Sequence, residues 1–152
     1  MDNEGLKNIL SGWAEGLEWE ESSQFLHVRV PAGALHGFAR KLKSDTQTAF
    51  DYLFCLTGVD WPEYMEVVYH LESTSHGHRL VMRSRTDGRE APVLDTVSDI
   101  WPTADPHERE VFDLFGIRFN HHPDLRRLLL TDEWEGYPLR KDYQDEINMI
   151  QL

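Results

Sequence analysis

The stretch 105–130, DPHEREVFDLFGIRFNHHPDLRRLLL, constrains the fold of this chain more than any other part of the sequence. Asp105 is a residue type that caps the start of a helix, and Glu108, three residues later, would complete a capping box with it. Gly116 is the residue type that most often ends a helix in the left-handed conformation. The pattern therefore predicts a short helix over 106–115.

Two charges on this predicted helix stand in the order that the helix dipole disfavours. Arg109 is at the N-terminal end, and Asp113, four residues later, is at the C-terminal end. A pair with this spacing contributes only ~0.3–0.5 kcal/mol on an isolated helix. We therefore predict that both side chains have charged partners outside their own helix, either elsewhere in this chain or on another subunit.

Three segments, EREVFDLFGIRF, HHPDLRRLL and GYPLRKDY, together carry a family resemblance. They resemble the 30 kDa subunit of respiratory complex I, the proton-pumping NADH:quinone oxidoreductase. The resemblance extends from about Asp51 to Tyr143. The residues whose spacing carries it are Glu108, Arg109, Glu110, Asp113, Gly116, His122, Pro123, Arg126 and Arg127.

The resemblance implies a non-catalytic structural subunit of the peripheral-arm, quinone-reducing module, supporting electron transfer from NADH to quinone. It implies no cofactor in this chain, with iron–sulfur clusters and FMN carried by partner subunits. The expected neighbours are the hydrogenase-related large (49 kDa-type) subunit and the small iron–sulfur subunit, on the cytoplasmic side of the bacterial inner membrane. Related subunits occur in energy-converting membrane hydrogenases, so the same scaffold role in such a complex is the alternative.

Composition excludes several other classes of function. A formal net charge of −12 argues against binding nucleic acid or anionic lipid. One cysteine, Cys55, excludes an internal disulfide and a cluster held by this chain's cysteines alone. No apolar run approaches the ~20 residues that cross a bilayer. The acidic N-terminus, MDNEGLKN, resembles neither a secretory signal nor a transit peptide.

Hydrophobic periodicity predicts the elements of the first half of the chain. Apolar residues at helical spacing predict an N-terminal helix from Leu6 to Leu17. Alternation over Gln24–Val30 predicts a strand, and Pro31 begins a helix with an apolar stripe. The segment 49–57 is apolar on both faces and is typical of an interior strand, which the helix would connect to the preceding strand by a parallel crossover. The stripe consists of Leu35, Phe38, Ala39 and Leu42.

The second half begins with a predicted hairpin of two strands, Met65–Leu71 and Arg79–Arg85. We interpret Val93–Trp101 as a short helix and Ile117–Asn120 as a brief strand. The expected fold is a single α+β domain with a mixed sheet, helices mainly on one face and an irregular C-terminal arm. Residues 1–120 would form the core, and residues 121–152 the interaction arm of the same domain.

A stand-alone metal-dependent hydrolase is a third hypothesis, based on His107 and Glu108. These two residues begin like a zinc-protease motif, but the position four residues after His107 is Val111 rather than a second histidine. The motif is therefore incomplete, and we expect no metal site and no catalytic residue in this chain.

The arm is rich in aromatic and cationic residues, the types enriched at the centres of protein interfaces. We predict that residues 123–143 lie on a neighbouring subunit rather than on their own domain, and the alternative is an arm folded back on this domain. Trp134 and Tyr137 would be anchors. The other expected interface residues are Arg126, Arg127, Arg140, Lys141 and Tyr143, with the cations pairing to acids on the partner or within the arm.

Overall fold

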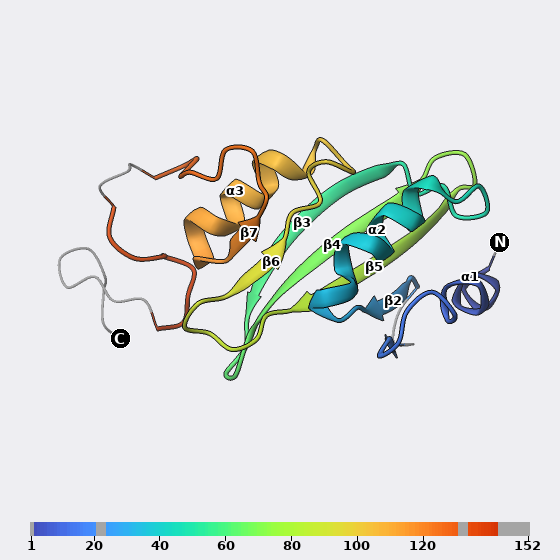
Figure 1. Cartoon of the computed structure of the whole chain (residues 1–152), viewed down its shortest axis with the longest axis horizontal. Helices are drawn as coiled ribbons and strands as arrows, with labels where there is room; N and C mark the ends of the chain where they lie inside the picture. Colours follow the sequence, from blue (N-terminus) through green and yellow to red (C-terminus); the bar gives the residue numbers. More distant parts are fainter. Residues whose placement is uncertain (1, 21–23, 131–133, 143–152) are drawn as a thin grey trace.

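The computed structural model describes residues 2–20, 24–130 and 134–142. Its largest element is a five-stranded sheet in the order β1-β2-β5-β4-β3, and a separate two-stranded sheet pairs β6 with β7 (Figure 1). The strands are β1 (Glu18–Glu20), β2 (Leu26–Arg29), β3 (Tyr52–Asp60), β4 (Met65–Ser73), β5 (His78–Arg85), β6 (Val93–Asp95) and β7 (Arg118–Asn120). The helices are α1 (Asn3–Leu10), the 3-10 turn η1 (Ala32–Ala34), α2 (Leu35–Ser44) and α3 (Ala104–Phe115). The α+β class and mixed sheet are as predicted.

The strand order differs from the sequence prediction at β3. This strand pairs only with β4 and forms an edge of the sheet, so the predicted interior position is wrong. β2 and β3 run in the same direction, but β5 and β4 lie between them, and the parallel neighbour of β2 is β5. The apolar run misled because Tyr52 and Phe54 are exposed while Leu53 and Leu56 point into the core.

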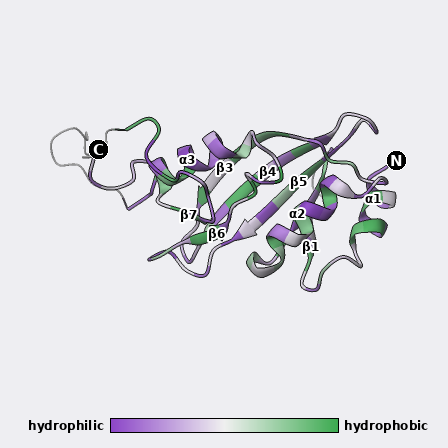
Figure 2. Cartoon of the chain, turned by 45° about the horizontal axis from the view of Figure 1, so that its top comes forward, coloured by the Kyte–Doolittle hydropathy of each residue, from purple (hydrophilic) through white to green (hydrophobic). Residues whose placement is uncertain are grey.

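The core forms between the sheet and the three helices. The predicted stripe of α2 is completely buried, and Leu6 and Leu10 of α1 join the same cluster. Side chains from alternate positions of the strands complete this core. Figure 2 shows the corresponding alternation of hydrophobic and hydrophilic residues along the strands and α2. α1 ends at Leu10, earlier than predicted, and Trp13 and Leu17 pack on the core from the loop that follows. The helices therefore cover one face of the sheet.

The segment 93–101 forms a strand and a turn, so the predicted short helix is wrong. β6 runs parallel to β7, and the amide of Thr96 donates to the carbonyl of Asn120 at 2.9 Å. Leu94 is buried while its neighbour Val93 is exposed, the alternation of a strand. β7 was predicted from sequence, but its partner was not, because pairing across more than twenty residues leaves no local signal.

No helix among the described residues is long and apolar enough to span a membrane.

Candidate functional site

Helix α3 places Glu108 inside the protein rather than at the helix terminus. Thr103 occupies the N-cap without a side-chain hydrogen bond, and Asp105 lies within the first turn. The predicted capping box is therefore wrong. Glu108 is fully buried, and its carboxylate accepts hydrogen bonds from the hydroxyl of Thr96 at 2.5 Å and from the amide of Val97 at 3.0 Å. It joins α3 to the segment after β6.

The buried carboxyl of Glu108 titrates in the neutral range. Burial raises its pKa to about 7, against the lowering effect of the hydrogen bonds from Thr96 and Val97. The carboxylates of Asp105 and Asp99 add to the rise because like charges disfavour ionisation. This end of α3 therefore contains an acid whose charge changes near physiological pH.

His122 closes this end of α3 from the start of the arm. Its side chain is completely enclosed, with Nε2 3.2 Å from the carboxylate of Asp105 and 3.9 Å from that of Glu108. Its Nδ1 accepts a hydrogen bond from the amide of Asp124 at 3.0 Å, so in the neutral ring Nε2 carries the hydrogen. The predicted site residue His122 thus binds its own domain.

Asp113 holds the arm at the other end of α3. Its carboxylate lies 3.0 Å from the guanidinium of Arg127 and also accepts three consecutive backbone N–H groups, from Leu128, Leu129 and Leu130, at 3.3, 2.7 and 2.9 Å. Burial alone would raise the pKa of Asp113, but these donors hold it below its ordinary value. An ionised, completely buried aspartate therefore fixes the first part of the arm.

Arg109 also binds the arm, but through neutral groups. Its guanidinium donates to the backbone carbonyls of Arg126 at 3.2 Å and of Arg127 at 3.3 Å. The prediction of charged partners outside the helix is confirmed for Asp113, which pairs with Arg127, and stays a prediction for Arg109, whose partners among the described residues are carbonyl oxygens. Both residues that oppose the helix dipole are thus used to bind the arm.

The second part of the arm returns to the C-terminal end of α3. The amide of Leu139 donates to the carbonyl of Leu114 at 2.9 Å, and the ring of Tyr137 lies 6.1 Å from that of Phe112. Gly116 ends the helix at φ 78°, as predicted, and a Cβ there would lie 2.6 Å from the ring of Tyr137. Glycine is therefore required both by the backbone and by the arm.

A second buried carboxylate, Asp60 at the end of β3, fixes the last described residues of the arm. It forms a paired contact with the guanidinium of Arg89 and accepts the amide of Lys141 at 2.7 Å. The guanidinium of Arg140 donates to the carbonyl of Arg89 at 3.1 Å and pairs with Asp142 at 3.0 Å. Sequence reasoning missed Asp60 and Arg89, which lie in turn-rich segments without a period to mark them.

These contacts correct the prediction that residues 123–143 lie on a neighbouring subunit rather than on their own domain. Arg127, Tyr137 and Arg140 bind their own domain through their side chains, and Lys141 binds through its amide. The arm folds back because buried acids supply the partners that an isolated segment lacks. Tyr143 lies outside the described residues.

The folded-back arm leaves apolar and cationic side chains at the surface. Leu129 is 63% exposed, Leu139 is 53% exposed and Leu128 is 40% exposed. Within the described part of the chain, the ion-pair partner of Arg126 is the exposed Asp124, two residues away. These four residues form what we call the arm surface: Arg126, Leu128, Leu129 and Leu139.

The remaining predicted residues are exposed or half-buried. Glu110 and Pro123 are exposed. Trp134 is half-buried, and its enclosed indole N–H has no hydrogen-bond acceptor among the residues that the structure describes. These residues stay candidates for contacts with a partner.

Glu108 does not form an open site with His107, because its carboxylate is enclosed against Thr96 and Val97. No group of three or more metal-ligating side chains occurs among the described residues.

Comparison with protein families matches residues 28–147 to the family described as "Respiratory-chain NADH dehydrogenase, 30 Kd subunit". One curated relative, the C/D subunit of the NADH-quinone oxidoreductase of Phocaeicola vulgatus, is 48% identical over 126 residues, which are 82% of this chain and 24% of the relative. The chain thus spans about a quarter of that relative. A second relative, the C subunit of the NADH-quinone oxidoreductase of Roseiflexus castenholzii, is 41% identical over 128 residues, 80% of this chain and 72% of the relative.

A solved structure also has this fold. It is described as the structure of the membrane-bound sulfane sulfur reductase, an archaeal respiratory membrane complex. The matching chain has a TM-score of 0.79 and 30% identity, over 93% of this chain and 85% of that chain.

Proposed function

The chain belongs to the 30 kDa subunit family of the respiratory-chain NADH dehydrogenase, and from this we propose that it is a structural subunit of a membrane-associated NADH:quinone oxidoreductase. It supports electron transfer from NADH to quinone in the peripheral-arm, quinone-reducing module and contributes no catalytic residue. The membership and the names of the relatives support this role. The chain holds no cofactor of its own in this proposal, and partner subunits carry the iron–sulfur clusters and FMN.

The observation that carries this proposal is the arm surface. Two buried aspartates, Asp113 and Asp60, fix the arm on the domain, and yet three of its leucines, Leu128, Leu129 and Leu139, are exposed. Fixing the arm before association reduces the entropy that docking must overcome. An exposed leucine leaves apolar area in water at ~25 cal/mol per Å², and a partner removes that area from water. The arm surface is therefore a preformed contact for another subunit.

The proposed partners are the hydrogenase-related large subunit and the small iron–sulfur subunit, on the cytoplasmic side of a bacterial inner membrane. Leu128, Leu129 and Leu139 supply the apolar contact, and Arg126 supplies a cation at its edge. Such edge charges determine orientation and association rate more than affinity.

Leu129→Glu tests this proposal. The side chain is largely exposed, so the isolated chain should unfold within about 0.5 kcal/mol of wild type. Its incorporation into the membrane complex should fall strongly, with a parallel loss of NADH:quinone activity, because the variant buries a carboxylate at the contact. Leu129→Met is the matched control, since it keeps an apolar side chain. Normal incorporation of Leu129→Glu would show that this surface is not the contact.

A second candidate is the same scaffold role in a respiratory complex with another electron donor. The likeness to a chain of the archaeal sulfane sulfur reductase complex favours it. Identification of the proteins that co-purify with the native chain separates the two. A flavin- and nicotinamide-binding companion supports the NADH complex, and its absence alongside a different donor-binding subunit supports the second candidate.

A further inference from the structure

The sheet has a second face that none of the described helices covers, because α1, α2 and α3 all pack into the core on the other side. Side chains from all five strands point to this face. Its cations are all arginines, although an ordinary solvated sheet face also carries lysine. We call it the arginine face and define it by Arg29, Arg79, Arg83 and Arg85.

Glu66 of β4 is the centre of the arginine face. It is fully buried, and its carboxylate lies 3.2 Å from Arg29, 3.0 Å from Arg83 and 3.4 Å from Arg85. The indole N–H of Trp61 also donates to it at 3.3 Å. Burial by itself would raise the pKa of Glu66, but hydrogen bonds from these donors hold it below its ordinary value. Three guanidinium groups thus share one carboxylate.

At this centre the guanidinium groups outnumber the carboxylates within ion-pair distance of them, although the whole face carries four glutamates, Glu18, Glu20, Glu66 and Glu72, beside its four arginines. Among the described residues, Glu66 is the one carboxylate within ion-pair distance of Arg83 and of Arg85, while Arg29 also pairs with Glu18 at 2.6 Å. Three cations therefore meet two anions, in a chain whose formal net charge is −12. The Nε of Arg83 is enclosed and has no hydrogen-bond acceptor among residues 2–20, 24–130 and 134–142.

Aromatic rings hold the arginines in place and widen the surface. The guanidinium of Arg85 lies 4.3 Å from the ring centre of Tyr64, and that of Arg79 lies 5.4 Å from that of Phe54. Tyr52 and Trp61 are 45% and 38% exposed. Rings and guanidinium groups fixed in this way lose little side-chain entropy when a partner binds.

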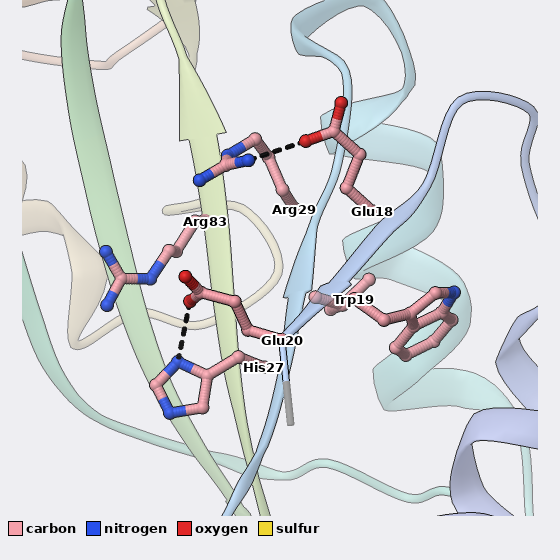
Figure 3. Close-up of a pocket in the computed structure, with 7 residues that line it drawn as sticks. Glu18, Trp19, Glu20, His27, Arg29 and Arg83 are labelled. Atoms are coloured by element: carbon pink, nitrogen blue, oxygen red, sulfur yellow. Dashed lines mark hydrogen bonds and ion pairs between the residues drawn. The ribbon is translucent and has the colours of Figure 1, made fainter. Parts of the chain in front are cut away.

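A small hollow of about 60 Å³ opens beside this cluster, between β1, β2 and β5 (Figure 3). Glu18 and Arg29 point toward each other along one side of it, and Glu20 faces His27 at 3.9 Å. Arg83 extends over the sheet beside them. The hollow has the size of a single carboxylate-bearing side-chain end, rather than that of a cofactor.

We propose that the arginine face is a second protein-docking surface, separate from the arm surface, and that its partner is a protein that presents carboxylates beside apolar side chains. Arginine and aromatic residues are enriched, and lysine is depleted, at interface centres. Carboxylates match the unshared guanidinium donors of Arg83 and Arg85, because a guanidinium binds a carboxylate through two parallel hydrogen bonds. The inference rests on the proposed function, since it assumes an assembly.

The test is charge reversal on this face in the full-length chain, expressed in place of wild type. Arg79→Glu is the main variant because the one ion pair of Arg79 among the described residues is with the partly exposed Glu72. Arg85→Glu is the second variant, because Glu66 retains its ion pairs with Arg29 and Arg83 when Arg85 is replaced. Arg40→Glu on α2 is the matched control, because it makes the same charge change on the other side of the molecule. The readout is the fraction of chain that co-purifies with the membrane complex, with thermal unfolding of each purified chain.

We expect Arg79→Glu and Arg85→Glu to reduce incorporation at least tenfold and Arg40→Glu to change it less than twofold. Arg85→Lys should retain only part of the incorporation, because it keeps the charge but cannot form the two parallel hydrogen bonds of a guanidinium. Radical footprinting of the wild-type complex gives a readout without substitutions: Tyr52 and Trp61 should be protected relative to the isolated chain. Unchanged footprints with normal incorporation of Arg79→Glu would overturn the proposal.

Three other outcomes would also overturn it or separate it from the proposed function. If the isolated wild-type chain dimerises and Arg79→Glu abolishes only the dimer, the face binds a second copy rather than an acidic partner. If Leu129→Glu is lost from the complex while both reversed variants remain, the proposed function stands and this inference fails. If wild type itself enters no complex, the proposed function fails first.

Discussion

Glu108 and Asp113 lie five residues apart on α3 and are both completely buried, yet their carboxyl groups behave in opposite ways. The pKa of Glu108 is raised to about 7, and the pKa of Asp113 is below its ordinary value. Burial disfavours the charged form at both positions. The difference lies in what each end of the helix supplies to the carboxylate.

Asp113 receives a guanidinium and three backbone N–H groups, all from the arm. Glu108 receives one hydroxyl and one amide, with two further carboxylates nearby. Donors that favour the ionised form outweigh burial in the first case and not in the second. The comparison teaches that α3 binds the arm through a permanent charge at its C-terminal end and has a titratable group at its N-terminal end.

The largest expected effect on stability is that of replacing Asp113, the permanently charged carboxylate of α3. Asp113→Ala leaves Arg127 and three amides without their acceptor, and it should lower the free energy of unfolding by about 3–5 kcal/mol. Urea denaturation measures this change. The control is Glu110→Ala on the exposed side of α3, which should change stability by less than about 0.5 kcal/mol. Equal effects would mean that the contacts of Asp113 do not stabilise the fold.

A pH series tests the titratable end. Because the folded pKa of Glu108 is above the unfolded value, its contribution to stability is complete below pH 4.5 and is lost as pH rises to 7. The loss is about 3 kcal/mol, from 1.36 kcal/mol per pKa unit. Glu108→Gln should remove this pH dependence, because the amide stays neutral while it accepts from Val97 and donates to Thr96. Parallel curves for wild type and variant would contradict the assignment.

The same series should show the opposite sign for Asp113. Its depressed pKa stabilises the fold above pH 4, and this stability is lost as pH falls further. The difference between wild type and Asp113→Asn should therefore shrink below pH 4.

Truncation removes the arm's second contact without touching Asp113. Deletion of the chain from Thr131 onward removes the packing of the Tyr137 ring against Gly116. It also removes the hydrogen bond from the amide of Lys141 to the carboxylate of Asp60. We expect the shortened domain to remain folded but to lose about 2 kcal/mol, because half-buried apolar area and several hydrogen bonds are lost, among them that of Leu139 to Leu114. Thermal unfolding of the isolated chain measures this. An unchanged melting temperature would mean that the return of the arm is not a stabilising contact.

The smallest effect compares neighbouring arginines. Arg126 is exposed and its ion pair in the described structure is with the exposed Asp124, so Arg126→Ala should change stability by less than about 0.5 kcal/mol. Arg127→Ala should cost several times more, because it leaves Asp113 buried without its cation. Denaturation of the two variants side by side measures both losses of stability. A larger loss for Arg126→Ala than for Arg127→Ala would mean that the arm is not fixed through Asp113.

The sequence by itself determined the local elements and the family. The stripe of α2, the alternation in β2, the β4–β5 hairpin and the left-handed end of α3 at Gly116 all follow from patterns within a few residues. Burial on one side of a helix or strand repeats with the period of that element, so the sequence records it directly. The motif on α3 then identified the family.

Only the tertiary structure decided which segments meet. It placed β3 at the edge, paired β6 with β7, enclosed Glu108 against Thr96 and folded the arm onto Asp113 and Asp60. Each of these outcomes depends on hydrogen bonds between residues that are distant in the chain. A local pattern shows that a group is polar or charged, but its energy depends on the donors around it. Those donors are known only when the chain has folded, as the opposite behaviour of Glu108 and Asp113 demonstrates.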